Sequence, residues 1–216
     1  MKKMLHMIVK TAWLCGLLAC VSTVQANVIT GKFWHVPEAV AQNAIPANVP
    51  GTTPDVVFDL NSPINLTNAG GSTVQDFLSS GGAFNIQENT AGTLASQLDD
   101  LVVGALFEFT GFVTVTNGQV FSVTHDDGLT LIIGGLDLGF GPGPTGPVAS
   151  NATYTGPTGT FAFQLVYTEC CGGPAVLAVD LPFGNTPSVP EPFTLGLLGI
   201  GLAGLGYGRS RGANRA

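Results

Sequence analysis

The stretch FEFTGFVTVTNGQVFSVTHDDGLTLII, residues 107–133, decides the fold class of this chain. Phe112, Thr114 and Thr116 alternate with Val113 and Val115, and the alternation resumes over 119–123. A period of two is typical of strands that bury one face. Asn117-Gly118 between the two runs is the strongest short-range hairpin signal. A further strand, Leu129–Ile133, follows Asp127-Gly128, so the stretch predicts consecutive antiparallel strands.

The rest of the chain adds short strands and few helices. Strands are predicted, in part from weaker signals, over Phe33–Val36, Val56–Leu60, Phe161–Tyr167 and Ala175–Leu181. The run Ser72–Gln75 resembles a capping box and predicts a short helix over Thr73–Leu78. A helical turn or two is expected over Thr93–Leu101, and a long surface loop over Gly139–Gly159. The fold class is therefore mainly β: an antiparallel β-sandwich with one or two short helices.

The N-terminus has the pattern of a signal peptide. Lys2, Lys3 and Lys10 form a basic region, and the uncharged apolar run Thr11–Val24 follows it. Val24-Gln25-Ala26 is a small-residue cleavage site, which assigns residues 1–26 to a signal helix. An alternative stays open, because Leu17–Cys20 resembles a lipoprotein box in which Cys20 would be lipidated.

The C-terminus has three parts in a fixed order. Val189-Pro190-Glu191-Pro192 comes first, then the uncharged stretch Phe193–Tyr207, then a basic end with Arg209 and Arg211. As a helix this stretch would span about 22 Å, which is short of the roughly 30 Å hydrocarbon core. The arginines act as a stop-transfer signal on the cytoplasmic side. The tail therefore suits a temporary membrane anchor, with a permanent anchor as the alternative.

This order resembles the PEP-CTERM family of exported bacterial proteins. The resemblance implies a partner, a membrane enzyme of the exosortase type that cuts near the Pro-Glu-Pro motif and removes the helix. It also implies export through the inner membrane, transient anchoring, and a final place at the cell surface or outside the cell. The expected division is a signal peptide at 1–26, a β-sandwich ectodomain at 27–187 and a sorting tail at 188–216.

The region between the targeting segments is strongly acidic. Residues 27–189 contain one lysine, Lys32, and thirteen carboxylates, which leaves a formal charge of −12. Nucleic acids and anionic membrane surfaces are disfavoured as partners, because both are bound through Lys and Arg. Divalent cations, neutral sugars and basic partners remain compatible. Negative charge also keeps a secreted protein soluble without any specific role.

Two adjacent cysteines, Cys170 and Cys171, remain after the signal peptide is set aside. Adjacent residues cannot crosslink distant parts of a fold. A vicinal disulfide is one reading in an oxidising compartment, and free or intermolecular thiols are the others.

The run Phe121–Gly134, with His125-Asp126-Asp127-Gly128 at its centre, resembles the central motif of the anthrax protective-antigen type of β-sandwich and of the related fibro-slime domain. The later segments Phe163–Glu169 and Ala175–Leu177 resemble the closing pair of strands in that family. The resemblance implies that Asp126 and Asp127 bind Ca²⁺, which orders sugar hydroxyls. Ca²⁺ takes six to eight oxygen ligands, so Asp137, Asn151, carbonyls or water would have to complete the site. Alternatively, Asp126-Asp127-Gly128 is only a tight turn.

These observations predict an exported surface or matrix protein that binds glycan, such as an exopolysaccharide, with the help of Ca²⁺. A structural biofilm protein without a defined ligand is the alternative. An enzyme acting on polysaccharide is a third reading, with Glu169 and Asp126 as acid and base. No spacing supports it, so the sequence predicts no catalytic residues and no enzymatic activity.

Overall fold

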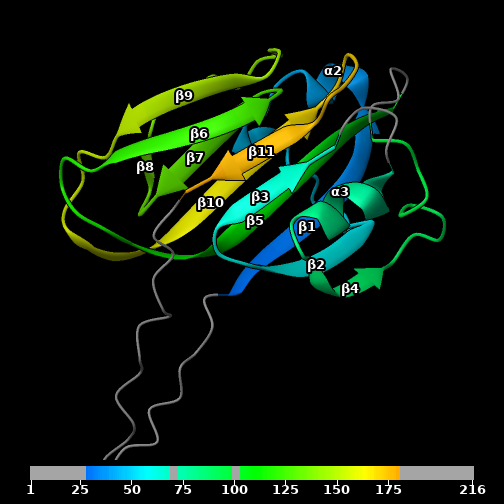
Figure 1. The fold of residues 1–216 in the computed structure, drawn as a ribbon, viewed down its shortest axis with the longest axis horizontal. Helices are drawn as coiled ribbons and strands as arrows, with labels where there is room; N and C mark the ends of the chain where they lie inside the picture. The colour runs from blue at the N-terminus through cyan, green and yellow to red at the C-terminus, as the bar shows by residue number, and fades with distance from the viewer. Residues whose placement is uncertain (1–27, 69–72, 99–102, 181–216) are drawn as a thin grey trace, which may run out of the picture.

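The computed structural model describes residues 28–68, 73–98 and 103–180, and these residues form two antiparallel sheets that face each other (Figure 1). The large sheet has the strand order β4 (Phe84–Glu88), β2 (Val56–Asn61), β1 (Val28–Pro37), β5 (Val103–Val115), β10 (Gly159–Glu169), β7 (Leu129–Ile133), β8 (Leu136–Asp137). The small sheet has the order β3 (Ile64–Thr67), β11 (Val176–Val179), β6 (Val120–Asp126), β9 (Val148–Thr153). The predicted mainly β sandwich is confirmed.

Alternating residues of both sheets fill the space between them. In β2, for example, Val56, Phe58 and Leu60 are buried while the residues between them are half-buried. Aromatic rings from both halves of the chain meet in this core: Phe33, Phe58, Phe77, Phe107, Phe109 and Tyr167. Fully burying one such side chain contributes about 1.5–3 kcal/mol, so this core holds the two sheets together.

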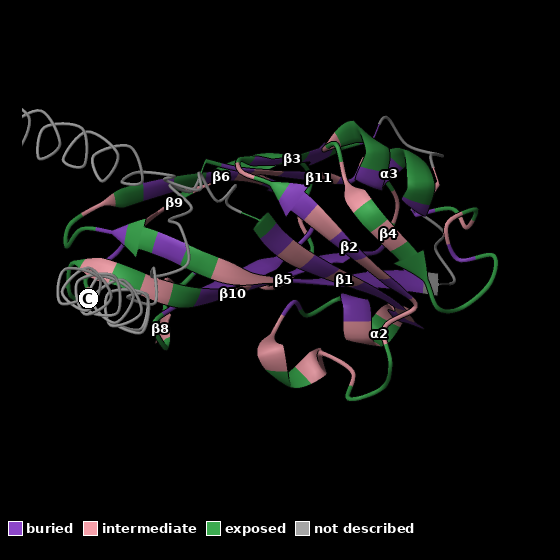
Figure 2. Ribbon diagram, turned by 90° about the horizontal axis from the view of Figure 1, so that it is seen from below, coloured by how far each residue is buried: buried purple, intermediate pink, exposed green. Residues whose placement is uncertain are grey.

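The outer faces of the two sheets differ. Figure 2 shows helix α2 (Glu38–Ala41) on the side of the large sheet that faces away from the small one. A second apolar cluster lies under it: Trp34, Val36, Ala41, Ala44, Leu106, Val166 and Cys170. On the same outer face Lys32 and Gln164 both bond the buried carboxylate of Glu108, at 2.8 and 2.7 Å. The segment after β1, which includes the 3₁₀ turn Pro46–Asn48, thus covers part of the large sheet.

Helix α3 (Val74–Ser80) starts one residue later than its capping signal predicted. Thr73, not Ser72, is the N-cap, because its hydroxyl accepts from the Asp76 backbone N–H at 3.2 Å. The Asp76 carboxylate accepts from the Thr73 backbone N–H at 3.1 Å and closes the capping box. Over the second predicted helix the described residues, Thr93–Leu98, form turns, so that prediction is wrong for them.

The hairpin predicted at Asn117-Gly118 is also wrong. Gly118 does form the turn, with a φ of 82° that favours glycine. However, β5 bonds β1 and β10 in the large sheet, whereas β6 bonds β11 and β9 in the small sheet. The turn therefore crosses between sheets. The same holds for β10 and β11, which follow each other in sequence but lie in opposite sheets.

The segment Gly139–Gly159 is not all loop, because β9 lies within it and pairs with β6 in regular register. Among the described residues no helix is long and apolar enough to cross a membrane. The predicted signal peptide, the sorting motif and the apolar helix fall outside these residues.

Candidate functional site

Asp126 and Asp127 lie where the chain leaves the small sheet and enters the large one. Asp126 is the last residue of β6, and Leu129 begins β7. The peptide bond between the two aspartates is cis. Both side chains are almost entirely removed from solvent, with exposed fractions of 3% and 4%. Figure 1 shows that the end of β6, the entry to β9 and the entry to β11 meet at this end of the sandwich, near α2.

Two loops are fastened to the Asp127 carboxylate. One carboxylate oxygen accepts the Thr145 backbone N–H at 3.0 Å, and the other accepts the Cys170 backbone N–H at 2.8 Å. The first donor belongs to the loop before β9 and the second to the loop between β10 and β11. Hydrogen bonds to a charged group contribute about 1.5–3 kcal/mol each, so Asp127 positions both loops.

Gly128 allows the loop before β9 to pass directly over the turn. A Cβ at this position would overlap the carbonyl group of Pro142. The Leu129 backbone N–H donates to the Gly141 carbonyl at 3.0 Å, and the Ala44 N–H donates to the Pro142 carbonyl at 2.9 Å. This close backbone approach requires glycine and fixes the loop at one end.

His125 ties the turn to β9. Its Nδ1 lies 2.5 Å from the Asp127 carbonyl oxygen, and its Nε2 lies 2.8 Å from the Ser150 hydroxyl. Since a carbonyl can only accept, Nδ1 carries a proton, and in the neutral ring Nε2 accepts from Ser150. The histidine is 3% exposed, so it acts as a buried crosslink between the turn and the edge strand.

On the core side of the turn, Tyr167 and Glu169 lie next to the two aspartates. The Tyr167 hydroxyl bonds the Asp126 backbone carbonyl and lies 3.0 Å from the Glu169 carboxylate. Burial and the nearby carboxylates raise the pKa of Tyr167 well above its ordinary value, so it stays protonated. Glu169, proposed above as an acid in the enzymatic reading, is fully buried and does not line the cavity described below.

The two aspartates differ in their electrostatic surroundings. Burial, followed by the charge of Asp127, raises the pKa of Asp126 to about 6. Burial also raises the pKa of Asp127, against the lowering effect of the bonds from Cys170 and Thr145 and of nearby His125. Within the described residues no hydrogen bond reaches the Asp126 carboxylate. One carboxylate is therefore built into the fold, while its neighbour accepts no hydrogen bond from the described residues.

A cavity of about 340 Å³ opens beside the pair. Its walls are the aspartates and the two loops that Asp127 fastens: Asp126, Asp127, Pro144, Thr145, Gly146, Pro147, Cys171, Gly172, Gly173 and Pro174. No cationic and no aromatic side chain is among them. The lining consists of two aspartates, three prolines, three glycines, one threonine and one cysteine.

Cys170 and Cys171 form a disulfide at the rim of the cavity. Cys170 is buried in the second apolar cluster, and Cys171 lies at the surface with a φ of 67°. The sulfur of Cys171 contacts Glu38 of α2 at 3.8 Å. This loop is thus joined both to the outer cover of the large sheet and to the cavity.

The proposed supplementary Ca²⁺ ligands do not reach this place. Asp137 lies on β8, where its carboxylate accepts the Gly139 N–H, and Asn151 lies in the middle of β9. Neither lines the cavity. In the part of the chain that the structure describes, no three His, Cys, Asp or Glu side chains form a metal-binding group. Further oxygen atoms at the pair would come from the backbone and Thr145, which sequence reasoning missed because only the folded loops bring them there.

Residues 188–211 match the family described as the PEP-CTERM protein-sorting motif. The tail is a PEP-CTERM sorting signal. The matched range contains Val189-Pro190-Glu191-Pro192, Arg209 and Arg211, and the prediction made from their order is confirmed. The PEP-CTERM signal indicates an exported protein that carries a membrane-anchored sorting tail for an exosortase.

Several solved structures have a similar backbone over the ectodomain. The PA14 sugar-binding domain from an RTX adhesin is 18% identical, with a TM-score of 0.49 over 73% of this chain and 95% of that chain. The PA14 domain of the MpAFP antifreeze protein is 20% identical, with a TM-score of 0.49 over 79% of this chain and 90% of that chain. A β-glucosidase from Kluyveromyces marxianus in complex with glucose is 10% identical, with a TM-score of 0.41 over 73% of this chain and 17% of that chain. No curated protein matches the chain significantly.

Proposed function

We propose that this protein is an exported surface module that binds glycan through a Ca²⁺ ion held at Asp126 and Asp127. The observation that carries the proposal is the Asp126 carboxylate, which is 3% exposed, lines a cavity and accepts no hydrogen bond from the described residues. Burying a charged carboxylate without a partner is costly. A cation in the cavity removes this cost, because it neutralises the repulsion between Asp126 and Asp127.

The donor set around the cavity suits Ca²⁺ better than a transition metal. Ca²⁺ binds carboxylate and carbonyl oxygens, and takes six to eight of them. The Asp127 oxygens each accept one N–H, which leaves each a second lone pair for a cation. Carbonyls of the two loops, Pro144–Pro147 and Gly172–Pro174, supply the remaining protein oxygens. Zinc would require His or Cys thiolates, and the lining cysteine is part of a disulfide.

Glycan is the ligand class that fits the rest of the site. The cavity has no cationic side chain, so it does not select phosphates or other anions. A Ca²⁺ ion in this position orders hydroxyl groups, and the proline rings of the rim offer apolar surface to a sugar ring. The sequence resemblance of Phe121–Gly134 to the central motif of the protective-antigen type of β-sandwich, which has sugar-binding members, supports the same class. An exopolysaccharide at the surface of the exporting cell is the proposed partner.

Thermal unfolding of the exported protein with EDTA and then with Ca²⁺ tests the metal. At a hundredfold excess over the dissociation constant, binding stabilises the fold by about 2.7 kcal/mol, and Asp126→Asn should abolish the shift. Asp137→Asn is the matched control, because it removes the same charge from an exposed carboxylate on β8. An equal Ca²⁺ response in wild type and Asp126→Asn would contradict the proposal.

Glycan binding is then measured on an array and on the polysaccharide of the producing cells. We expect binding that EDTA removes, that Ca²⁺ restores and that Asp126→Asn lacks. Binding that is unaffected by EDTA would place the glycan elsewhere and contradict the joint site. Because the proposal contains no catalytic step, the reducing ends of the polysaccharide should not increase during incubation.

A structural matrix role is the second candidate. The small sheet favours it, since its four strands contain a single charged residue, Asp126, and that residue is buried. Such a face suits protein–protein contact as well as exposure to solvent. If Ca²⁺ has no effect on stability and the protein self-associates at high concentration, this role would be favoured over glycan binding.

A further inference from the structure

We infer that the open edge of β9 is a self-association site, at which two copies of this chain pair their β9 strands antiparallel about a two-fold axis. The inference concerns a different region from the carboxylate pair and needs no Ca²⁺. It rests on which of the four sheet edges in the described part of the chain are protected against pairing. An unprotected edge offers unpaired N–H and C=O groups to another strand.

Three of these edges carry features that block pairing. Edge strand β8 has two residues, one of them Asp137. Edge strand β4 pairs irregularly with β2 at Val57/Asp59 and ends in Glu88. Edge strand β3 is preceded by Pro63, and its Thr67 N–H is taken by the Ser80 hydroxyl at 2.9 Å from α3. Short length, charge, irregularity, proline and cover are the usual protections of sheet edges.

Strand β9 follows Pro147, as β3 follows Pro63, but it has no charge, no irregular pairing and no cover from another described element. Its residues Val148–Thr153 read Val-Ala-Ser-Asn-Ala-Thr, without charge or proline, and pair with β6 in unbroken register. Most of them are exposed, and no other described element bonds to their free side. Exposed apolar residues lie beside this edge, since Val148 is 38% and Val120 is 63% exposed.

The hydrogen-bond pattern shows which groups are available. The Tyr154 N–H donates to the Gln119 carbonyl at 2.8 Å, in the same ladder as β6 and β9. Alternation along an antiparallel strand then directs the backbone groups of Ala149, Asn151 and Thr153 away from β6. Pairing about a two-fold axis at Asn151 brings each Ala149 opposite the partner's Thr153 and forms about six inter-strand hydrogen bonds.

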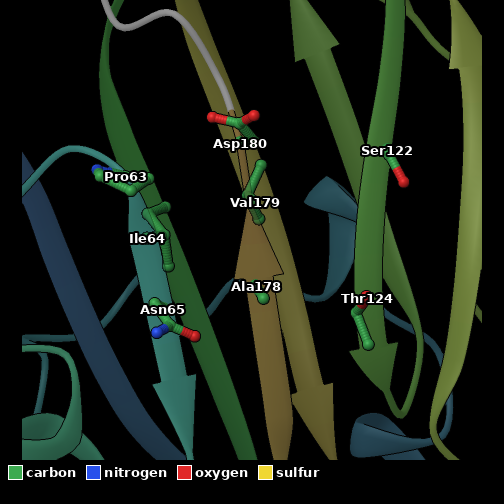
Figure 3. A pocket seen from close by; sticks show the side chains of 8 residues that line it. All are labelled: Pro63, Ile64, Asn65, Ser122, Thr124, Ala178, Val179 and Asp180. Atoms are coloured by element: carbon green, nitrogen blue, oxygen red, sulfur yellow. The ribbon is translucent and has the colours of Figure 1, made fainter.

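Charge identifies a second copy as the occupant. The ectodomain carries one lysine against thirteen carboxylates, so two copies repel each other over most of their surfaces. The small sheet is the exception. Figure 3 shows its outer face around Asn65, Ala178, Ser122 and Thr124, with Asp180 at the exit of β11. At the β9 edge of this sheet two acidic copies can meet without carboxylates facing each other. The product is a continuous eight-stranded sheet.

Sedimentation velocity over a wide concentration range tests the inference on the full exported protein. An interface of one short strand is smaller than a standard interface, so we expect a weak dimer that dissociates on dilution. Asn151→Lys places two like charges opposite each other at the axis and should weaken the dimer at least about tenfold. Thr153→Lys is the second edge variant and should act in the same direction.

Asn65→Lys is the matched control. It makes the same substitution on an exposed residue of the same outer face, but on β3, the protected edge. The inference predicts an Asn65→Lys dimer like that of wild type. A monomer at every concentration, or a dimer that both edge variants leave intact, would overturn it. Equal weakening by Asn65→Lys and Asn151→Lys would also overturn it, because β9 would then have no special part.

Discussion

The Asp126–Asp127 turn and strand β9 are neighbours, linked by the side-chain bond of His125 to Ser150, yet they are built in opposite ways. The turn concentrates buried charge, close backbone contacts, and bonds from two loops to one carboxylate. Strand β9 has no charge, is largely exposed and, among the described residues, pairs only with β6. The first arrangement holds a few oxygen atoms in fixed positions, as a cation site requires. The second leaves backbone groups free for another strand. Substitutions that break the backbone contacts or hydrogen bonds of the turn should therefore destabilise the fold strongly, whereas substitutions at exposed positions of β9 should have almost no effect on its stability.

The largest effect is expected at Gly128. A methyl group there overlaps the Pro142 carbonyl, so Gly128→Ala must displace the loop before β9. We expect a loss of at least about 3 kcal/mol of unfolding free energy, measured by urea denaturation. In the control Gly141→Ala the new Cβ meets no atom within 4 Å. A similar loss in both variants would mean that the contact at Gly128 does not set the loop.

Asp127 should come next. Asp127→Ala leaves the N–H groups of Thr145 and Cys170 without their acceptor, and we expect a loss of about 2–4 kcal/mol. Asp126→Ala removes a carboxylate without a hydrogen bond and, in EDTA, should be neutral or stabilising. Urea denaturation of both variants in EDTA measures the difference. If both lose stability equally, the distinction between a structural and a free aspartate is wrong.

The sequence located some strands and turns of this structure and missed others. Strand signals located Val56–Leu60, where buried and half-buried residues alternate, and Leu129–Ile133, where four of the five residues are buried. Strand β9 was missed since its Ala, Ser, Asn and Thr residues lie at an edge where no strong apolar pattern is needed. The Asn117-Gly118 signal correctly located a turn, but a turn signal does not say whether the chain re-enters the same sheet or crosses to the other one.

The candidate site shows a similar limit. The aspartate pair was found because its motif is continuous in sequence. The groups that fasten it are backbone N–H groups of Thr145 and Cys170, which are 18 and 43 residues from Asp127. Every residue type except proline carries such a donor, so composition gives no signal for them. Only the packing of the two loops against the turn reveals which donors are used.

Lowering the pH should increase the contribution of Asp126 to the free energy of unfolding. The pKa of Asp126 is about 6 in the folded protein and about 3.9 in an unfolded chain. A raised carboxyl pKa favours the fold below pH 4, and this contribution is lost as the pH rises through 6. In EDTA the wild type should therefore gain about 1 kcal/mol relative to Asp126→Asn between pH 7 and pH 4, a figure reduced because solvent in the adjoining open cavity screens the carboxylate.

Thermal melts of the two proteins across this pH range measure the difference. Saturating Ca²⁺ should reverse its direction, since the cation binds the charged form and is released on protonation. A constant difference between the two proteins at all pH values in EDTA would show that Asp126 is not the group that titrates.

The smallest effect is expected at Asn151 on β9. In dilute solution, where the chain is monomeric, Asn151→Lys should change the unfolding free energy by less than about 0.5 kcal/mol, as is usual for exposed positions without specific contacts. The long lysine side chain points to solvent, and the bonds between β9 and β6 are made by the neighbouring residues. Urea denaturation at low protein concentration measures this value.

A loss above about 1 kcal/mol would show that Asn151 supports the monomer itself, and β9 would then belong with the turn as part of the fixed structure. An unchanged monomer combined with a weakened dimer separates the two regions, because one substitution then affects association and leaves folding alone.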